Sequence, residues 1–94
     1  MIVQSIHFTF APDDADEVEA IALELRDASR KEAGVVSYDV GRSRDKPGVF
    51  AFWEVYRDAA SLEAHLQSEH FNRLVVGRIR PMLKERNFEK VDLL

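Results

Sequence analysis

A glutamate and a histidine stand among apolar residues within one stretch of the chain, residues 50–71 (FAFWEVYRDAASLEAHLQSEHF). Glu54 lies on the same side of a predicted strand as Phe50, Phe52 and Tyr56. His65 lies between Leu62 and Leu66 at the spacing of one helix face. Burying an ionised carboxylate costs on the order of several kcal/mol unless it is paired or hydrogen-bonded. An imidazole titrates near neutral pH. Both groups could transfer protons in a cavity, or they could form a structural ion pair and a satisfied core histidine.

The other two histidines and a tyrosine extend this candidate site. His70 follows Ser68, which can cap a further helical segment, and the positive end of that helix would keep the His70 imidazole neutral. A neutral imidazole can act as a base, although an exposed position beside the cap is the alternative. We expect His7, on the first strand, to face the second helix across a partly polar pocket. Tyr38, like Trp53, could pack against an aromatic ligand or lie in the core.

Several kinds of cofactor site find no support in the sequence. The chain contains no cysteine, which excludes disulfides, thiolate catalysis and zinc-ribbon sites. The histidines at positions 7, 65 and 70 include no pair at the i, i+4 spacing of a zincin, so we expect no metal. The four glycines stand alone, and no phosphate-binding loop for a nucleotide cofactor is predicted.

Length and composition restrict the class of protein. With 94 residues the chain has the length of one domain, residues 1–94. Its hydrophobic content of 46% and charged content of 32% are typical of a soluble globular protein, and no apolar run is long enough to cross a bilayer. The first residues, MIVQSIHFTF, resemble a strand and not a signal peptide, which predicts a cytoplasmic location without a membrane partner. The net charge of -4 argues against nucleic acid as a partner.

Hydrophobic periodicity predicts the order strand, helix, strand, strand, helix, strand. Asp13 or Asp14 would cap the first helix and Gly34 would end it, while Asp58 would open the second helix and Pro81 would end the helical run that follows. Strands are expected at residues 1–10, 35–42, 49–56 and 86–94. This βαββαβ order favours a ferredoxin-like α+β sandwich, with two helices on one face of a four-stranded antiparallel sheet.

The third strand, residues 49–56 (VFAFWEVY), is apolar on both sides. Helices can cover only one face of such a sheet, so the other face also needs cover. A second copy of the chain packed sheet to sheet is the simplest source, and we therefore expect a homodimer.

A longer pattern joins these residues. Gly34-x3-Tyr38 is followed by Phe50-x3-Glu54-x-Tyr56, and then by Leu62-x2-His65, Ser68 and His70-Phe71. With this pattern the chain resembles the antibiotic biosynthesis monooxygenase (ABM) domain family over nearly its whole length, and the segment EVYRDAASLEAHLQSEHF is its most specific part.

The resemblance implies a dimeric α+β barrel in which each subunit holds a small cavity between its helices and its sheet. Similar proteins include cofactor-independent quinol monooxygenases, which oxidise electron-rich phenols and quinols without flavin, haem or metal. They also include the enzyme that degrades the phosphorylated autoinducer-2 signal.

Haem-degrading relatives share this architecture but differ in the residues that line the cavity. They carry an asparagine, a tryptophan and an iron-ligating histidine there. By alignment, this chain has His7, His65 and Val75 at those positions. Since the axial ligand is missing, the resemblance implies no haem, and we expect no cofactor.

The resemblance suggests a base that removes a phenolic or enolic proton, after which the substrate anion reacts directly with O₂. We expect His65 to be this base, or a hydrogen-bond donor to the anion, with Tyr38 as a further polar contact. Helical phase favours His65 over Glu54, which would face either the cavity or the dimer barrel. The expected substrate-binding residues are His7, Phe50, Trp53, His70 and Phe71.

Two alternatives use the same scaffold. An isomerase or degrading enzyme of a small phosphorylated signal would need a basic pocket near Arg42, Arg44 or Arg86 to hold the phosphate. A ligand-binding stress-response module would keep the fold without its chemistry.

Overall fold

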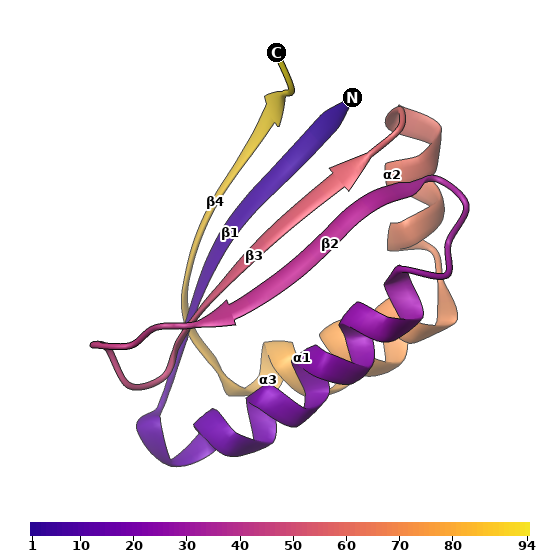
Figure 1. Ribbon diagram of the computed structural model, residues 1–94. Helices are drawn as coiled ribbons and strands as arrows, with labels where there is room; N and C mark the ends of the chain where they lie inside the picture. Colours follow the sequence, from indigo (N-terminus) through magenta and orange to yellow (C-terminus); the bar gives the residue numbers. More distant parts are fainter.

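The computed structural model describes residues 1–94, which form a four-stranded antiparallel sheet with helices on one face (Figure 1). The strands lie in the order β2-β3-β1-β4, which confirms the predicted ferredoxin-like α+β arrangement. The elements are β1 (Ile2–Phe10), the 3₁₀ turn η1 (Pro12–Asp14), α1 (Ala15–Ser29), β2 (Val35–Arg42), β3 (Val49–Tyr56), α2 (Ala59–Leu66), the π-helix η2 (Phe71–Ile79), α3 (Arg80–Met82) and β4 (Leu83–Asp92).

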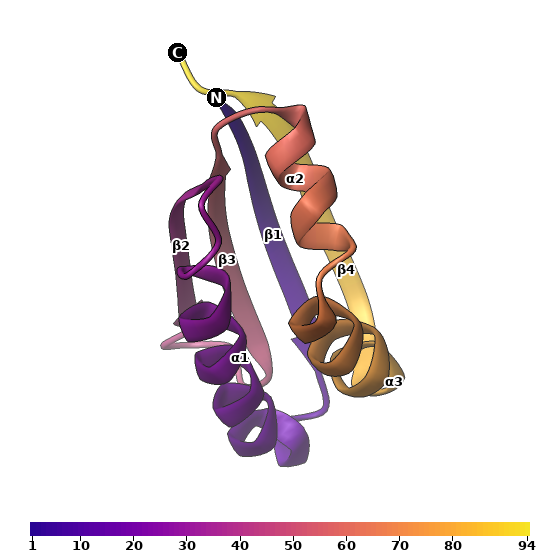
Figure 2. The ribbon, with the colours of Figure 1, turned by 90° about the vertical axis from the view of Figure 1, so that its right-hand side faces the viewer.

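The helices form one layer over the sheet, as the view in Figure 2 shows. α1 contacts β2 and η2, and α2 contacts β3 and η2. The buried stripe of α1 contains Val18, Ile21 and Leu25 at helical spacing. Opposite this stripe, phenylalanines from β1 and β3 pack edge to face, with the rings of Phe8 and Phe52 5.5 Å apart. No helix is long and apolar enough to cross a membrane.

A bulge in β2 sets which of its side chains face the helices. Val35 pairs with Tyr56, but the next paired residue is Ser37, so Val36 is left without a partner. Strict alternation along β2 would put Val36 on the same side as Tyr38, but the bulge interrupts the alternation. Val36 is exposed, whereas Tyr38 is buried directly opposite Glu54.

The helix ends follow some of the sequence signals and not others. The Asp58 carboxylate accepts a hydrogen bond from the Ser61 amide at 2.8 Å, as expected for a cap. Asp14 occupies the cap position of α1, but its side chain makes no capping hydrogen bond. α1 ends at Ser29, well before Gly34, and β4 begins at Leu83, three residues before the expected start.

Gly34 is required by close packing and not by a left-handed helix end. Its φ angle is not positive, since Gly48, with φ of 84°, is the glycine in that region. A Cβ added at position 34 would collide with the Ser61 side chain, so the loop before β2 can lie directly against α2 only with glycine there.

Gly34→Ala should therefore lower the free energy of unfolding by about 1–3 kcal/mol, as measured by urea denaturation. Gly41→Ala is the matched control, because a Cβ at position 41 meets no atom within 4 Å. We expect the control to change stability by no more than about 0.5 kcal/mol. Equal free energies of unfolding for the two variants would show that the loop can move away from α2 without loss of stability, which would contradict this explanation.

Candidate functional site

A cavity of about 270 Å³ lies between the helices and the sheet. An apolar cavity of about 150 Å³ can hold benzene, so this space admits an aromatic ring with substituents. Most of the wall is hydrophobic, and a few polar and charged groups converge on it. The lining residues are Gln4, Ile6, Phe8, Leu25, Tyr38, Phe52, Glu54, Leu66, Phe71, Val75, Arg80, Leu83, Arg86, Phe88 and Lys90.

Glu54 is the buried acidic group of this cavity, with an exposed fraction of 4%. The strand register places it between Gln4 of β1 and Tyr38 of β2. The Tyr56 hydroxyl donates a hydrogen bond to Glu54 Oε1 at 2.6 Å, and Gln4 Nε2 donates to the same oxygen at 3.5 Å. The carboxyl group is thus held from its own strand and from a neighbouring strand.

Burial raises the pKa of Glu54 to about 7, against the opposing effect of hydrogen bonds from Tyr56, Tyr38 and Gln4. Burial also raises the pKa of the Tyr38 hydroxyl, and the nearby Glu54 charge raises it further. Burial and the nearby Glu54 charge likewise raise the pKa of the Tyr56 hydroxyl. Near neutral pH, Glu54 can therefore accept or release a proton, while both tyrosines keep theirs.

The opposite side of the cavity is basic and open to solvent. Arg86, Phe88 and Lys90 lie on β4, and their side chains are exposed although they line the cavity. The Arg80 guanidinium lies 5.7 Å from the centre of the Phe71 ring. A ligand entering along β4 would pass these cations before it reached Glu54.

Three of the predicted site residues, Tyr38, Glu54 and Phe71, line the cavity. The open question of whether Glu54 faces the cavity or a dimer barrel is thereby answered in favour of the cavity. His65 is buried, with an exposed fraction of 1%, but it does not line the cavity. Its ring packs 5.6 Å from Tyr38 and 5.4 Å from Tyr56. Position therefore favours Glu54 over His65 as the group that meets a ligand, which reverses the preference drawn from helical phase.

Four predicted contacts lie elsewhere. His7 and Trp53 are exposed on the face of the sheet that turns away from the helices, so the expectation that His7 faces the second helix was wrong. The physical reason is that the phenylalanines of β1 alternate with His7 and bury themselves against the helices. Phe50 is buried beside Phe10 outside the cavity, and the side chain of His70 turns toward a glutamate after α1.

Four residues of the cavity and of its surroundings were not predicted from the sequence. Gln4 has the parity of Ile6 and Phe8 in the first strand, which is the signal that could have paired it with Glu54. Arg80 and Lys90 lie in segments where charged residues are frequent, so nothing marked them as cavity residues. Glu32 lies in a turn and meets its partners, His65 and His70, only through the fold.

The sequence model of the antibiotic biosynthesis monooxygenase family matches residues 1–76. The chain belongs to this ABM family. Its fold is similar to the crystal structure of an antibiotic biosynthesis monooxygenase, with a TM-score of 0.91 and 28% identity over 100% of this chain and 99% of that chain. It is also similar to PA3566 from Pseudomonas aeruginosa, with a TM-score of 0.90 and 30% identity over 99% and 93% of the two chains.

A relative from Synechocystis sp., the uncharacterized protein sll1783, is 31% identical over 74 residues. The match covers 79% of this ABM chain and 50% of that protein, so the chain spans about half the length of this curated relative.

The raised pKa of Glu54 makes the stability of this ABM domain depend on pH. Glu54 binds its proton up to about pH 7 in the folded state and up to about pH 4.5 in the unfolded chain. Because the folded state binds more protons between these values, the free energy of unfolding falls as the pH rises through them. By pH 8 the loss should be on the order of 3 kcal/mol.

Glu54→Gln should remove this dependence, because the amide oxygen can still accept from Tyr56 but carries no charge. The variant should match the wild type near pH 4.5 and exceed its stability near pH 8, as measured by urea denaturation at both pH values. Glu17→Gln, at an exposed position of α1, is the control and should keep the wild-type slope. Parallel pH profiles for wild type and Glu54→Gln would contradict the pKa shift.

Proposed function

We propose that this ABM domain is a monooxygenase that lets a small phenolic, quinol-type or enolisable substrate react directly with O₂. The observation that carries the proposal is the Glu54 carboxyl, buried on the wall of a ring-sized cavity with a pKa of about 7. A base with a pKa near the working pH is suited to remove a proton from a carbon or oxygen acid. Membership of the ABM family supports the same reaction class.

In the proposed reaction, the Glu54 carboxylate takes a proton from the bound substrate. The substrate anion gives one electron to O₂, and the resulting radical and superoxide combine into a peroxide anion on a substrate carbon. The protonated Glu54 returns its proton to this anion. The resulting hydroperoxide breaks its O–O bond and loses water, whose second hydrogen comes from the same carbon, which leaves a carbonyl group. In total the substrate loses two hydrogens and gains one oxygen atom, while the second oxygen atom leaves with those hydrogens as water. The substrate supplies all the electrons.

The surrounding side chains have separate roles in this proposal. Tyr38 keeps its proton because burial raises its pKa, so its hydroxyl can donate a hydrogen bond to the substrate anion. Phe71 and Val75 supply apolar wall that excludes water from the anion. His65 packs behind Tyr38 and Tyr56 and acts as a positioning residue.

The basic side of the cavity supports a second candidate function. Arg80, Arg86 and Lys90 could hold the phosphate of a small phosphorylated signal, as an isomerase or degrading enzyme would require. Of the arginines considered from sequence, Arg42 does not line the cavity and instead forms salt bridges with Asp16 and Glu19.

Oxygen uptake by metal-free protein distinguishes these functions. We expect uptake with members of a panel of quinols and anthrols, at a rate that rises with pH through about 7 as Glu54 ionises. Glu54→Gln should lower kcat by about 100-fold or more, and Glu17→Gln should leave it unchanged. Turnover of a phosphorylated sugar without oxygen uptake would favour the second function. Absence of turnover with either class would favour a non-catalytic binding module.

We further propose that two copies of the chain pair through the open face of the sheet. Trp53, with an exposed fraction of 45%, and Val91 are apolar residues on that face. An exposed tryptophan beside other apolar side chains is typical of an interface.

Sedimentation velocity at low micromolar concentration should show a dimer for the wild type. Trp53→Arg should shift it toward the monomer, because a charge would be buried in the interface. Leu23→Arg is the matched control, since Leu23 is an exposed apolar residue on α1 and the variant should stay dimeric. A wild-type monomer would refute this interface.

A further inference from the structure

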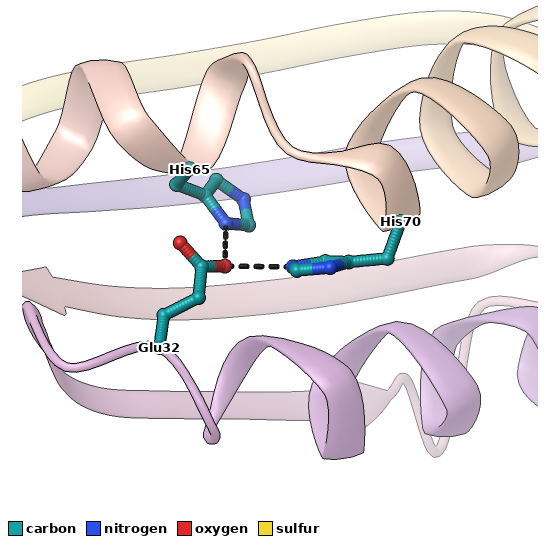
Figure 3. A group of neighbouring side chains, drawn as sticks. All are labelled: Glu32, His65 and His70. Carbon is teal, nitrogen blue, oxygen red and sulfur yellow. Dashed lines mark hydrogen bonds and ion pairs between the residues drawn. The ribbon is translucent and has the colours of Figure 1, made fainter.

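A carboxylate and two imidazoles converge between the turn after α1 and the α2–η2 segment (Figure 3). His65 Nδ1 and His70 Nε2 each lie 2.7 Å from Glu32 Oε2, and the three ligand atoms lie within 4.8 Å of one another. None of the three residues lines the cavity. We propose that this Glu32–His65–His70 triad is a binding site for a divalent transition-metal ion of the zinc class.

The donor set suits such an ion. Imidazole nitrogen and carboxylate oxygen bind Zn²⁺, Co²⁺ and Ni²⁺ well, and three protein ligands leave a position for water. Tetrahedral ligands about 2.0–2.1 Å from zinc lie about 3.3 Å apart. Each nitrogen, now 2.7 Å from Oε2, would therefore have to move about 0.6 Å away from it, and the three ligand atoms already lie within 4.8 Å of one another. His65 is buried, while Glu32 and His70 keep partial exposure that gives an ion access.

The backbone holds the ligands in place before any ion binds. The Glu32 amide donates to the Ser29 carbonyl at 3.0 Å, and the Val35 amide donates to the Glu32 carbonyl at 3.2 Å. Ser68 fixes the turn between the two histidines, because its hydroxyl donates to the His65 carbonyl at 2.7 Å and accepts from the Phe71 amide. A site with fixed ligands loses little conformational entropy on binding.

An ion in the triad would join three segments that hydrogen bonds and packing alone now connect. It would tie the turn after α1, the end of α2 and the start of η2 into one unit. His65 also packs against Tyr38 and Tyr56, so the ion would brace the polar wall of the cavity from behind. Its expected effect is on stability and does not depend on the proposed oxidation.

The test uses untagged, chelator-treated protein titrated with Zn²⁺ in a calorimeter. We expect one ion per chain, and a rise in Tm of about 10 °C when free Zn²⁺ is about 100 times Kd. His70→Ala and Glu32→Gln should each weaken binding by more than about 100-fold, beyond the loss typical of an outer-shell partner. His7→Ala is the matched control, because it removes the remaining histidine, exposed on the opposite face, and should leave the affinity unchanged.

Co²⁺ gives a second measurement on the wild type, which decides the matter even if a variant fails to fold. Bound cobalt should show the intense visible bands of a four- or five-coordinate ion. Only the weak bands of hydrated cobalt would overturn the proposal and leave the triad as a hydrogen-bonded cluster. Binding to His70→Ala as tight as to the wild type, or its loss in His7→Ala, would also overturn it.

Discussion

The Glu54 carboxyl finds its hydrogen bonds among neighbouring side chains, because the residue has an exposed fraction of only 4%. The register of three strands supplies these partners. β1 brings Gln4 to one side, the bulge in β2 brings Tyr38 to the other, and Tyr56 reaches back along the same strand. A slip of one residue in either pairing would turn Gln4 or Tyr38 to the opposite face of the sheet, and Glu54 would keep Tyr56 but lose a partner from the neighbouring strand. The acidity of Glu54 is therefore a property of strand pairing as much as of one residue.

On the face of the sheet that the helices cover, one part packs into the hydrophobic core and another part lines the cavity. Near α1, phenylalanines such as Phe10 and Phe50 pack edge to face and fill the space completely enough to be almost fully buried. Toward β4 the helices leave side chains exposed, and the cavity opens there. The close-packed core near α1 gives rigid support to the cavity near β4, because a domain of this size has only a small hydrophobic core.

The fold class could be predicted because its signals are local. Strand alternation, the Asp58 cap and the apolar stripe of α1 each depend on a few neighbouring residues. The same alternation correctly grouped Glu54 with the aromatic residues of its side, but β3 is apolar on both sides and so could not show which side the helices cover. His7 was misplaced for that reason. The bulge at Val36 and the position of Glu32, 33 residues from His65 in sequence, depend on contacts that no local pattern contains.

The π-helix η2 sets the rotational phase of the short helix α3 that continues from it. The Arg80 amide bonds to the Val75 carbonyl five residues earlier, one residue more than in an α-helix. In an α-helix each residue turns the chain by about 100°, so one residue fewer in η2 would point Arg80 away from the cavity while Phe71 stayed in place. The π-helical turn thus has the effect of one extra residue inserted into an α-helix, which the surrounding fold accommodates. It lets an apolar wall and a cation come from the same short helical segment.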